Sequence, residues 1–463
     1  MPFDLLSKLG EDRELSAVFS ESRAVADWLS VEAAFAGALA DAGVIDSGTA
    51  DRIGAACTAD LIDLDKLWRE TRNVGYPILP LVKQIVSALS EEDAAWVHYG
   101  ATTQDIMDSA LALQLRDATA RLSDLVQGFG DAVALLVEQH AGAVMPGRTH
   151  AQQAVPTTFG LKMAVYLDQL ARDAERLTAA CAQASVVSSY GAGGTSAALG
   201  SHGPAVRAAL AARLGLADAE IPWHVARDRV AQLTSAAALL SGTCIRFARE
   251  VVDLSRTEVG EVSEATGKYR GASSTMPQKA NPISAEAIIG FGVIAQTSSA
   301  AMLRALEAGH ERAAGEWQVE WSAVPSCLVA AASAASVAQE AASTLLVFPD
   351  RMRANLSRDG GRILAEAYMI TLAQHVGRDL AHEVVYDAVQ LSRSENLPLP
   401  EAVERSVTSD LWAKVSTELP SSDGYVGNAG DLCAAAVKAW RSRPTQPVGA
   451  PDSPTHDHQR ATP

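Results

Sequence analysis

Four long runs of the sequence have the periodicity of helices that are much longer than average. The first extends from Asp105 to about Ala143 without a proline, and its apolar residues recur at helical spacing. This run is either one helix or two helices joined near Gly128 and Gly130. The other three runs cover roughly residues 157–189, 228–264 and 283–306. Because an average globular helix has about a dozen residues, these runs restrict the fold to long helices packed side by side.

The composition favours helices over sheets. Of the 463 residues, 48% are hydrophobic, only 5% are aromatic, and alanine is the most frequent. Because long helices that are apolar on more than one face must be covered by neighbours, including other subunits, we expect a central bundle that oligomerises. The predicted fold is all-α. Its parts are an N-terminal helical domain (1–100), a central long-helix bundle (101–348), a C-terminal helical domain (349–441) and a proline-rich, polar tail (442–463) that should be disordered.

The charge and the cysteines argue against several classes of partner and site. A net charge of −17 is unfavourable for binding nucleic acid or an anionic membrane. The five cysteines are scattered and lack CxxC spacing, so neither a disulfide framework nor a zinc site is indicated. The N-terminus has no continuous apolar core, and no stretch reads as apolar for the length of a membrane span. We therefore expect a cytoplasmic protein without a metal ion.

One loop, GASSTMPQKANP from Gly271 to Pro282, concentrates chemically active residues between two helical runs. Pro277 and Pro282 each remove an amide donor, so neither flanking helix can continue through it. An ordinary connector, with Asn281 as the helix N-cap and Pro282 at the first helical position, explains only two of its residues. Two adjacent serines and Lys279 predict hydroxyls beside backbone amides and one cation. Such a setting can bind a carboxylate or hold a serine as its alkoxide.

This loop resembles the signature loop of the fumarase/aspartase superfamily, G-S-S-x-M-P-x-K-x-N-P, with Ala272 as its one departure. The resemblance implies a homotetrameric α-helical lyase, with active sites shared between subunits and no cofactor. Such enzymes remove a proton beside a carboxylate and expel a group from the next carbon. By position, Ser273 is implied as the base, with Ser274 as its close competitor. Lys279 and Asn281 are implied to neutralise the aci-carboxylate, and Ser274 and Met276 to bind substrate.

The stretch GRTHAQQAVPTT contains the second group of candidates. An isolated histidine such as His150 is most simply a core residue. The stretch resembles the superfamily's second motif region, G-R-T-H-x-Q-x-A-x-P-x-T, in which the histidine acts as an acid or orients the substrate and the glutamine, here Gln152, binds it. The resemblance also places a glutamate against this histidine, seven residues after the loop lysine, where Glu286 stands. A carboxylate on an imidazole fixes its tautomer, as an acid/base histidine requires.

Two further stretches supply candidate groups for binding a substrate carboxylate. In WVHYGATTQD, Thr102 or Thr103 is the predicted N-cap of a long helix, and a helix N-terminus also favours an anion. This stretch resembles the superfamily's first motif region, which grips a carboxylate. In RETRNVGYP, Arg72 and Asn73 are expected on a loop that is either a solvated turn or, by the same resemblance, part of the substrate pocket. Adenylosuccinate lyases usually have T-R-H-D where this chain has T-R-N-V.

Three other segments indicate a branch of the superfamily. YGAGGTSAALG is not preceded by a strand and so is not a phosphate-binding fingerprint. It resembles a turn of the 3-carboxy-cis,cis-muconate cycloisomerases, as do WHVARDR and HERAAGEWQVEW, which imply Arg227 and Arg312 as substrate-binding residues. Without the resemblance, Trp317 and Trp321 are simply core residues four apart on one helix face.

Two departures from that branch bear on the reaction. Ala280 follows the loop lysine where arginine is usual, and His150 stands where many bacterial cycloisomerases have tryptophan. We therefore expect a lyase that eliminates a group from a succinate-type polycarboxylate and gives fumarate, as the nitrosuccinate lyases of this branch do. The alternatives are a carboxymuconate cycloisomerase and, less favoured, an adenylosuccinate lyase or an inactive helical scaffold.

Overall fold

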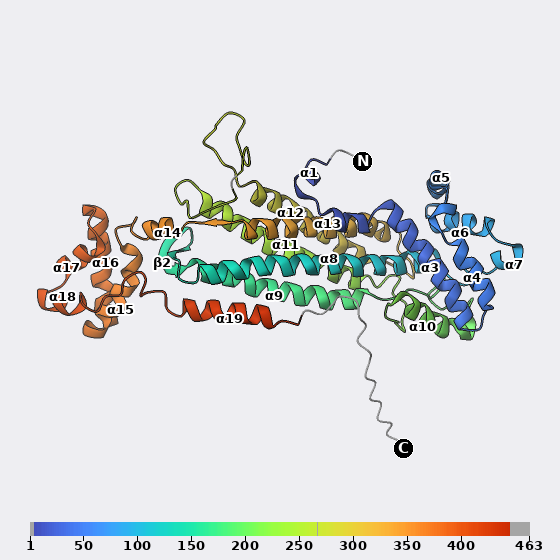
Figure 1. Ribbon diagram of the computed structural model, residues 1–463. Helices are drawn as coiled ribbons and strands as arrows, with labels where there is room; N and C mark the ends of the chain where they lie inside the picture. Colours follow the sequence, from blue (N-terminus) through green and yellow to red (C-terminus); the bar gives the residue numbers. More distant parts are fainter. Residues whose placement is uncertain (1–3, 266, 445–463) are drawn as a thin grey trace, which may run out of the picture.

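The computed structural model describes residues 4–265 and 267–444. Five helices run along the long axis of the molecule and form a bundle (Figure 1). These are α8 (Thr103–Gln139), α9 (Phe159–Ala184), α11 (Asp228–Ser255), α12 (Ile283–Arg304) and α13 (Glu316–Ser343). The predicted long run is thus one continuous helix, α8. Gly128 and Gly130 do not break it, because their missing side chains admit the side chains of Gln339 and Trp440.

Helix α19 (Ala429–Ser442) lies along the bundle although it is the last helix of the described chain (Figure 1). Its Cys433, Val437 and Trp440 are buried in the same apolar core as α8 and α9. Trp440 also donates a hydrogen bond of 2.8 Å from Nε1 to Asp131 on α8. The C-terminal segment of the chain is therefore attached to the middle of the molecule. The tail expected to be disordered lies mostly outside the described residues.

Smaller helices lie at each end of the bundle (Figure 1), and each end has its own apolar cluster. At the N-terminal end are α3 (Glu21–Asp41), α4 (Ser47–Ala56), α5 (Leu64–Val74), α6 (Ile78–Ser87), α7 (Glu91–Ala94) and α10 (Gly203–Leu214). At the other end are α15 (Ala365–Val376), α16 (Arg378–Glu395), α17 (Leu399–Ser406) and α18 (Ser409–Val415). Shorter pieces are α1 (Ser7–Gly10), α2 (Arg13–Val18) and α14 (Pro349–Leu356). The domain boundaries drawn from the sequence stay a prediction.

Two small antiparallel sheets interrupt the helical pattern that the sequence predicts. Strands β1 (Val144–Thr149) and β2 (Gln152–Thr158) form a hairpin, and β3 (Val262–Ser263) pairs with β4 (Leu346–Val347). The hairpin turns at His150 and Ala151, whose φ angles of 48° and 61° are the left-handed values that a tight hairpin turn requires. The helix predicted to reach Glu264 ends earlier, because α11 stops at Ser255 and an extended segment follows.

Two predicted boundaries are wrong by a few residues. Arg72 and Asn73 lie in the last turn of α5, not in a loop, because the chain contains no breaker before Gly75, which ends the helix in a left-handed conformation (φ 90°). Asn281 is not the N-cap of α12. That position is Pro282, whose side chain accepts no hydrogen bond.

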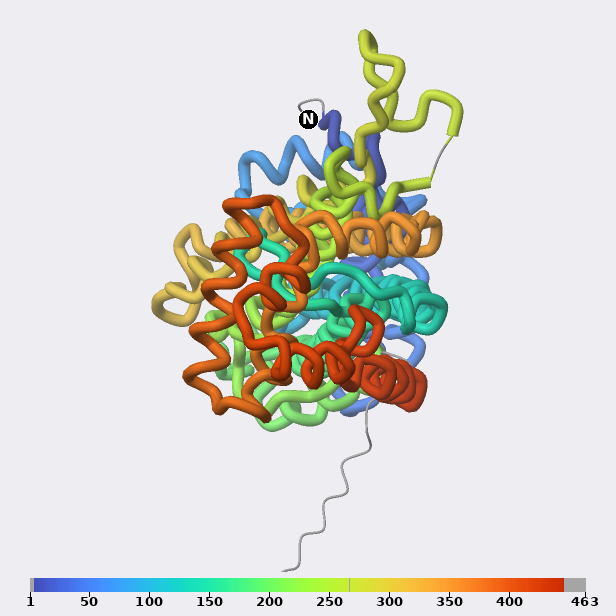
Figure 2. Tube along the Cα trace, turned by 90° about the vertical axis from the view of Figure 1, so that its left-hand side faces the viewer, coloured from blue at the N-terminus to red at the C-terminus, as the bar shows by residue number. Residues whose placement is uncertain are grey.

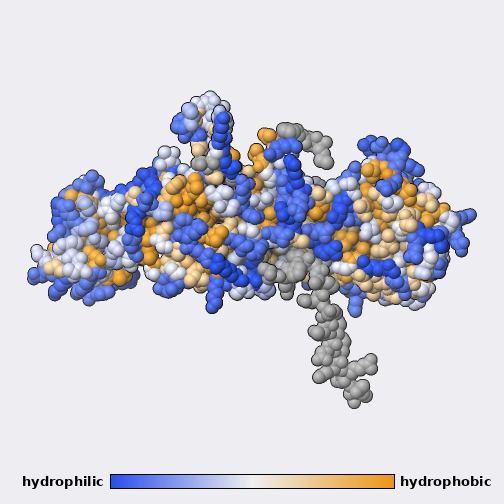
Figure 3. All heavy atoms as spheres, in the orientation of Figure 1, coloured by the Kyte–Doolittle hydropathy of each residue, from blue (hydrophilic) through white to orange (hydrophobic). Residues whose placement is uncertain are grey.

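The expectation that no stretch is long and apolar enough for a membrane span is also wrong, when only length and composition are considered. The segments Ile283–Glu307 and Glu316–Ser343 both meet that test. Helix α13 is a core helix, because 61% of its most apolar 18-residue stretch is buried. In the α12 segment, only 39% of the most apolar 18-residue stretch is buried. Hydrophobic areas accordingly appear on the surface along the middle of the molecule (Figure 3).

Candidate active site

The signature loop is a narrow hairpin that projects from the bundle (Figure 2). At its neck the amide of Asn281 donates to the carbonyl of Gly271 at 2.8 Å, and Ala272 pairs with Ala280 in an antiparallel bridge. Gly271 has φ 66°, and a Cβ there would lie 2.4 Å from the carbonyl oxygen of Asn281. The neck therefore requires glycine at position 271, the position just before the loop's departure from the superfamily pattern.

Ser273 and Lys279 stand just above this neck. They follow and precede the isolated Ala272–Ala280 bridge on its loop side, and the amide of Lys279 donates to the carbonyl of Met276 at 3.1 Å in a turn. The Ser273 Oγ accepts hydrogen bonds from the amides of Thr275 at 3.3 Å and Met276 at 3.2 Å. Ser273 is half-buried and Lys279 is exposed. Two amides that donate to one hydroxyl oxygen favour its negatively charged form. In the described part of the chain, no hydrogen bond joins the Lys279 side chain to Ser273.

A carboxylate that the sequence reading missed holds the base of the loop. Glu264, 9% exposed, accepts the first free amides of α12, from Ser284 at 3.0 Å and Ala285 at 2.8 Å. Arg270 donates from Nη2 to the Ser284 hydroxyl at 2.8 Å. Glu264 thus performs the capping that was assigned to Asn281. No local signal identifies it, because the acceptor and the helix lie 20 residues apart in the sequence.

His150 lies at the exposed tip of the β1–β2 hairpin, and Gln152 follows it, also exposed. The hairpin is anchored by Arg148, which makes a two-pronged ion pair of 2.9 and 2.7 Å with the fully buried carboxylate of Glu261. Glu286 is exposed on the first turn of α12. Within the described part of one chain, no hydrogen bond joins His150 to Glu286. Both side chains are available to groups from outside this subunit.

The first motif region is built around a buried carboxylate. Thr102 is the N-cap of α8, as predicted, and its amide donates to Asp105. Asp105 has five partners: the amides of Thr102, Tyr190 and Gly191, the Ser188 hydroxyl and Nε2 of His224, at 2.8–3.1 Å. Burial raises the pKa of Asp105, but His224 and the two amides of the glycine-rich turn outweigh it and the pKa is lowered. Asp105 therefore fixes that turn against the start of α8.

The same turn brings Arg312 toward the N-terminus of α8. Arg312 donates from Nη2 to the carbonyl of Ala192 at 3.1 Å, and the neighbouring Gly191 is the residue bound to Asp105. Thr102, Thr103 and Arg312 are only partly buried. A helix N-terminus, two hydroxyls and a guanidinium group are thus gathered in one region of one chain, and this combination is suited to an anionic ligand.

Arg227, also predicted to bind substrate, does not lie with Thr102, Thr103 and Arg312 at an accessible site. Its guanidinium is 2% exposed and lies between Asp108, at 2.8 and 3.0 Å, and Glu320, at 2.8 and 2.7 Å. The ring of Trp223 lies 4.9 Å from the guanidinium carbon. Because Nε, Nη1 and Nη2 are all occupied inside the protein, Arg227 links α8 to α13 and does not face a substrate. Burial raises the pKa of Asp108, an effect that the charge of Arg227 opposes.

The candidate residues are spread over the length of the bundle. Thr102 and Thr103 begin α8, whereas the hairpin with His150 follows its other end, and 37 residues of helix extend about 55 Å (Figure 1). Arg72 and Asn73 lie on α5, at the α3–α7 end of the molecule. One chain therefore brings Ser273 and Lys279 together, and separately Thr102, Thr103 and Arg312, but does not unite all of them.

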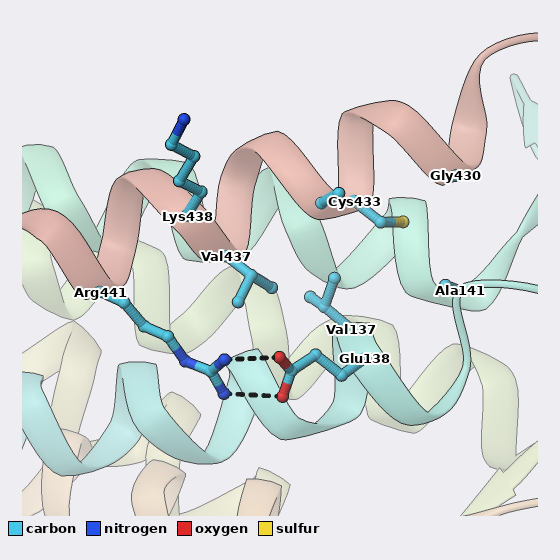
Figure 4. A pocket seen from close by; sticks show the side chains of 9 residues that line it. Val137, Glu138, Ala141, Gly430, Cys433, Val437, Lys438 and Arg441 are labelled. Atoms are coloured by element: carbon cyan, nitrogen blue, oxygen red, sulfur yellow. Dashed lines mark hydrogen bonds and ion pairs between the residues drawn. The ribbon is translucent and has the colours of Figure 1, made fainter.

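A hollow with a volume of about 410 Å³ lies between α8 and α19, away from these residues (Figure 4). It is lined by Val137, Glu138, Ala141, Gly430, Cys433, Ala434, Val437, Lys438 and Arg441. Arg441 forms an ion pair of 2.8 Å with Glu138, and the floor is apolar. In residues 4–265 and 267–444, no group of three or more His, Cys, Asp or Glu side chains is arranged to hold a metal ion.

Comparison with known proteins identifies the family. A family model described as Lyase matches residues 10–296. The 3-carboxy-cis,cis-muconate cycloisomerase of Pseudomonas aeruginosa is 39% identical, over 93% of this chain and 93% of its own. Trans-aconitate decarboxylase 1 of Mycosarcoma maydis is 34% identical, over 95% of this chain and 89% of its own. The nitrosuccinate lyase of Streptomyces davaonensis is also 34% identical, over 94% of both chains.

The fold gives the same answer. The crystal structure of a fumarate lyase from Mesorhizobium sp. BNC1 superposes with a TM-score of 0.86 and 36% identity, covering 93% of this chain and 98% of its own. Sequence and fold therefore agree over nearly the whole chain. The protein belongs to the lyase family and is an enzyme of the fumarase/aspartase superfamily.

Proposed function

We propose that the enzyme eliminates a group from a succinate-type polycarboxylate and releases fumarate. The observation that carries this proposal is the environment of Ser273, whose oxygen accepts two loop amides and which lies beside the same hairpin neck as Lys279. A serine in this setting can act as a base toward a carbon acid beside a carboxylate. An inactive scaffold has no need of this arrangement.

The proposed reaction proceeds in two steps. The Ser273 alkoxide takes the proton from the carbon beside a substrate carboxylate, and the electron pair moves into that carboxylate as an aci-carboxylate. Lys279 and Asn281 neutralise its charge. The pair then forms the carbon–carbon double bond, and the leaving group departs from the next carbon with its bonding electrons. Ser274, Met276, Thr102, Thr103 and Arg312 are proposed to hold the remaining carboxylates, with Arg72, Asn73 and Gln152 from the other motif regions.

The leaving group is the least constrained part of the proposal. The relative from Streptomyces davaonensis is named for nitrosuccinate, and nitrite departs without protonation, so a nitrosuccinate lyase depends little on a general acid. The second candidate is lactonisation of a carboxymuconate, which is favoured by the 39% identity to the Pseudomonas aeruginosa cycloisomerase. Ala280 and His150, the two departures noted in the sequence, favour elimination over lactonisation.

We further propose that the enzyme is a homotetramer whose active sites combine residues of several chains. Two observations support this: the dispersal of the candidate residues along α8, and the exposed apolar side chains of the α12 segment. The latter are Ile283, Val293, Ile294, Leu303 and Leu306. Burying them against further copies removes apolar area from water. Because these side chains are 38–49% exposed, each contributes at most about half of the roughly 1.5–3 kcal/mol of a fully exposed side chain that becomes buried. A cytoplasmic location and small anionic substrates, with neither nucleic acid nor membrane as partner, complete the proposal.

The decisive experiment is a substrate screen on the purified enzyme. Nitrosuccinate, carboxymuconate, adenylosuccinate and trans-aconitate are supplied in turn, and fumarate is followed by its ultraviolet absorbance with products checked by mass spectrometry. Fumarate and nitrite from nitrosuccinate are the expected products. Turnover of carboxymuconate alone would support the second candidate, whereas turnover of adenylosuccinate or trans-aconitate alone, or of none of the four, would overturn the proposal.

A further inference from the structure

We propose that Glu264 is a positioning residue for the loop that carries Ser273. The inference rests on the proposed role of Ser273 as the base. Helix α12 begins directly after the loop. Its first amide, from Ile283, donates to the Asn281 carbonyl, but the Pro282 side chain at the N-cap position offers no acceptor to the next two, from Ser284 and Ala285. Glu264 supplies that acceptor with both carboxylate oxygens, Oε2 to Ser284 and Oε1 to Ala285.

The bonds at Ser284 close the base of the loop from both sides. Its amide is held by Glu264, and its hydroxyl accepts from Arg270, which immediately precedes Gly271 on the entering strand. The entering strand and the start of α12 are therefore joined below the neck. A negative charge at a helix N-terminus is also favourable to the helix dipole, which strengthens this attachment.

This clamp determines the register of the neck. Above it come the hydrogen bond from Asn281 to Gly271 and the Ala272–Ala280 bridge, and Ser273 and Lys279 are the next residues of the two strands. A slip of one residue in an antiparallel pair turns every side chain to the opposite face. If α12 loses its fixed start, the leaving strand can slip, and Ser273 and Lys279 no longer share a face. Glu264 thus acts on the chemistry through the geometry of the loop, without contacting substrate.

The test compares Glu264→Gln with Glu340→Gln. The control makes the same chemical change at a carboxylate that also lies near Arg270, at 3.7 Å, but is exposed and bound to no α12 amide. Glu264→Gln should lower kcat by about 10²-fold, as a misplacement of about 1 Å does, with KM close to the wild-type value. The acid limb of its pH–rate profile should move to higher pH as the amides leave the Ser273 oxygen. Glu340→Gln should change neither.

Hydrogen exchange of the peptide that covers residues 271–285 gives a reading independent of turnover. It should speed up in Glu264→Gln and stay unchanged in Glu340→Gln. Unchanged exchange together with unchanged kcat, or a raised KM with unchanged kcat, would overturn the inference. If the wild type turns over no substrate, the proposed function fails while exchange still decides the role of Glu264. If Glu264→Gln does not fold, the milder Glu264→Asp, whose shorter side chain withdraws the carboxylate from the Ser284 and Ala285 amides, must show the same changes to sustain it.

Discussion

Ser273 and Lys279 are the residues next to the Ala272–Ala280 bridge on its loop side, one on each strand of a narrow hairpin neck. Their separation of six residues in the sequence is the spacing that an antiparallel register around this bridge requires. The loop amides of Thr275 and Met276 then approach the Ser273 oxygen from above the neck. A sequence spacing that looks arbitrary is thus the consequence of closing a tight loop between Ser273 and Lys279.

Replacing Ser273, the proposed base, should strongly lower turnover without unfolding the protein. Ser273→Ala should lower kcat by about 10²- to 10⁴-fold, because a positioned base contributes that much to proton transfer. Steady-state kinetics on the substrate identified by the screen measure the effect, and thermal unfolding verifies the fold. Ser274→Ala is the matched control, since it removes a neighbouring hydroxyl that accepts no loop amide within the described chain. Near-normal turnover in Ser273→Ala, or an equal loss in Ser274→Ala, contradicts the assignment.

His150→Ala distinguishes the kinds of leaving group. A poor leaving group needs a proton, and losing a positioned acid costs about 10²- to 10⁴-fold in rate. Nitrite departs unprotonated, so for nitrosuccinate we expect a much smaller loss of kcat and a change mainly in KM. The measurement is the pH dependence of kcat for the wild type and for His150→Ala. Gln152→Ala serves as the control for a pure binding defect in the same hairpin. A loss in kcat as large as that of Ser273→Ala would instead favour an essential acid.

The helical body could be predicted from the sequence because its signals are local. Apolar spacing and the absence of proline identified α8, and the threonine before it identified its N-cap at Thr102. Gly128 and Gly130 left open a break, and only the packing of Gln339 and Trp440 against them explains why the helix continues. The side chains that fill those positions lie more than 200 residues away in the sequence, beyond the reach of any local pattern.

The environment of the candidate residues could not be predicted for the same reason. Arg148 and Glu261 are 113 residues apart, and Arg227 is 119 residues from Asp108 and 93 from Glu320. The motif resemblance placed Arg227 among substrate-binding groups, but a guanidinium is bound to carboxylates as readily inside a protein as in a substrate. Whether Arg227 binds the protein's own carboxylates or those of a substrate depends on the residues that pack around it. Its guanidinium is buried, which only the fold reveals, so its role is structural.

The buried ion pairs of Arg227 with Asp108 and Glu320 lead to a prediction about stability. Arg227→Met should lower the free energy of unfolding by about 3–5 kcal/mol, because Asp108 and Glu320 remain buried without their counter-charge. Arg405→Met is the control. Arg405 pairs with Glu395 and Glu401 on the surface, where an ion pair contributes about 0–1 kcal/mol. Urea unfolding measures both. Equal, small losses in the two variants would show that the buried ion pairs are not stabilising.

His98 makes the stability depend on pH. Its Nδ1 lies 2.6 Å from the buried carboxylate of Glu32. Burial lowers the pKa of His98, but the charge of Glu32 and their hydrogen bond outweigh it and raise the pKa above the usual 6.5. A raised pKa means that the folded state binds the proton more tightly than the unfolded state. The stabilisation of the folded state by protonated His98 is therefore complete below pH 6.5. It is lost as the pH rises through the raised pKa that His98 has in the folded state.

Urea unfolding of the wild type and His98→Gln, from about pH 5 to about pH 9, tests this linkage. The stability difference should be largest on the acidic side and shrink as the pH rises, by about 1.4 kcal/mol for each unit by which the pKa is raised. His382→Gln, a change at an exposed histidine on α16, should leave the pH dependence as in the wild type. A difference between wild type and His98→Gln that stays constant across the range would contradict the role of the His98–Glu32 pair.

Shared active sites predict complementation between impaired chains. Ser273 and His150 lie on separate hairpins of one chain, with no hydrogen bond between His150 and Glu286 in the part that the structure describes. If each site takes the two residues from different subunits, co-expressed Ser273→Ala and His150→Ala chains will form some sites with both intact, and a population of sites with the wild-type kcat and KM will return. Mixing Ser273→Ala with Lys279→Ala is the control. Both changes lie in one loop, so no intact site can form. Mixed tetramers without such a population, or a fully active monomer by light scattering, would show that each site belongs to one chain.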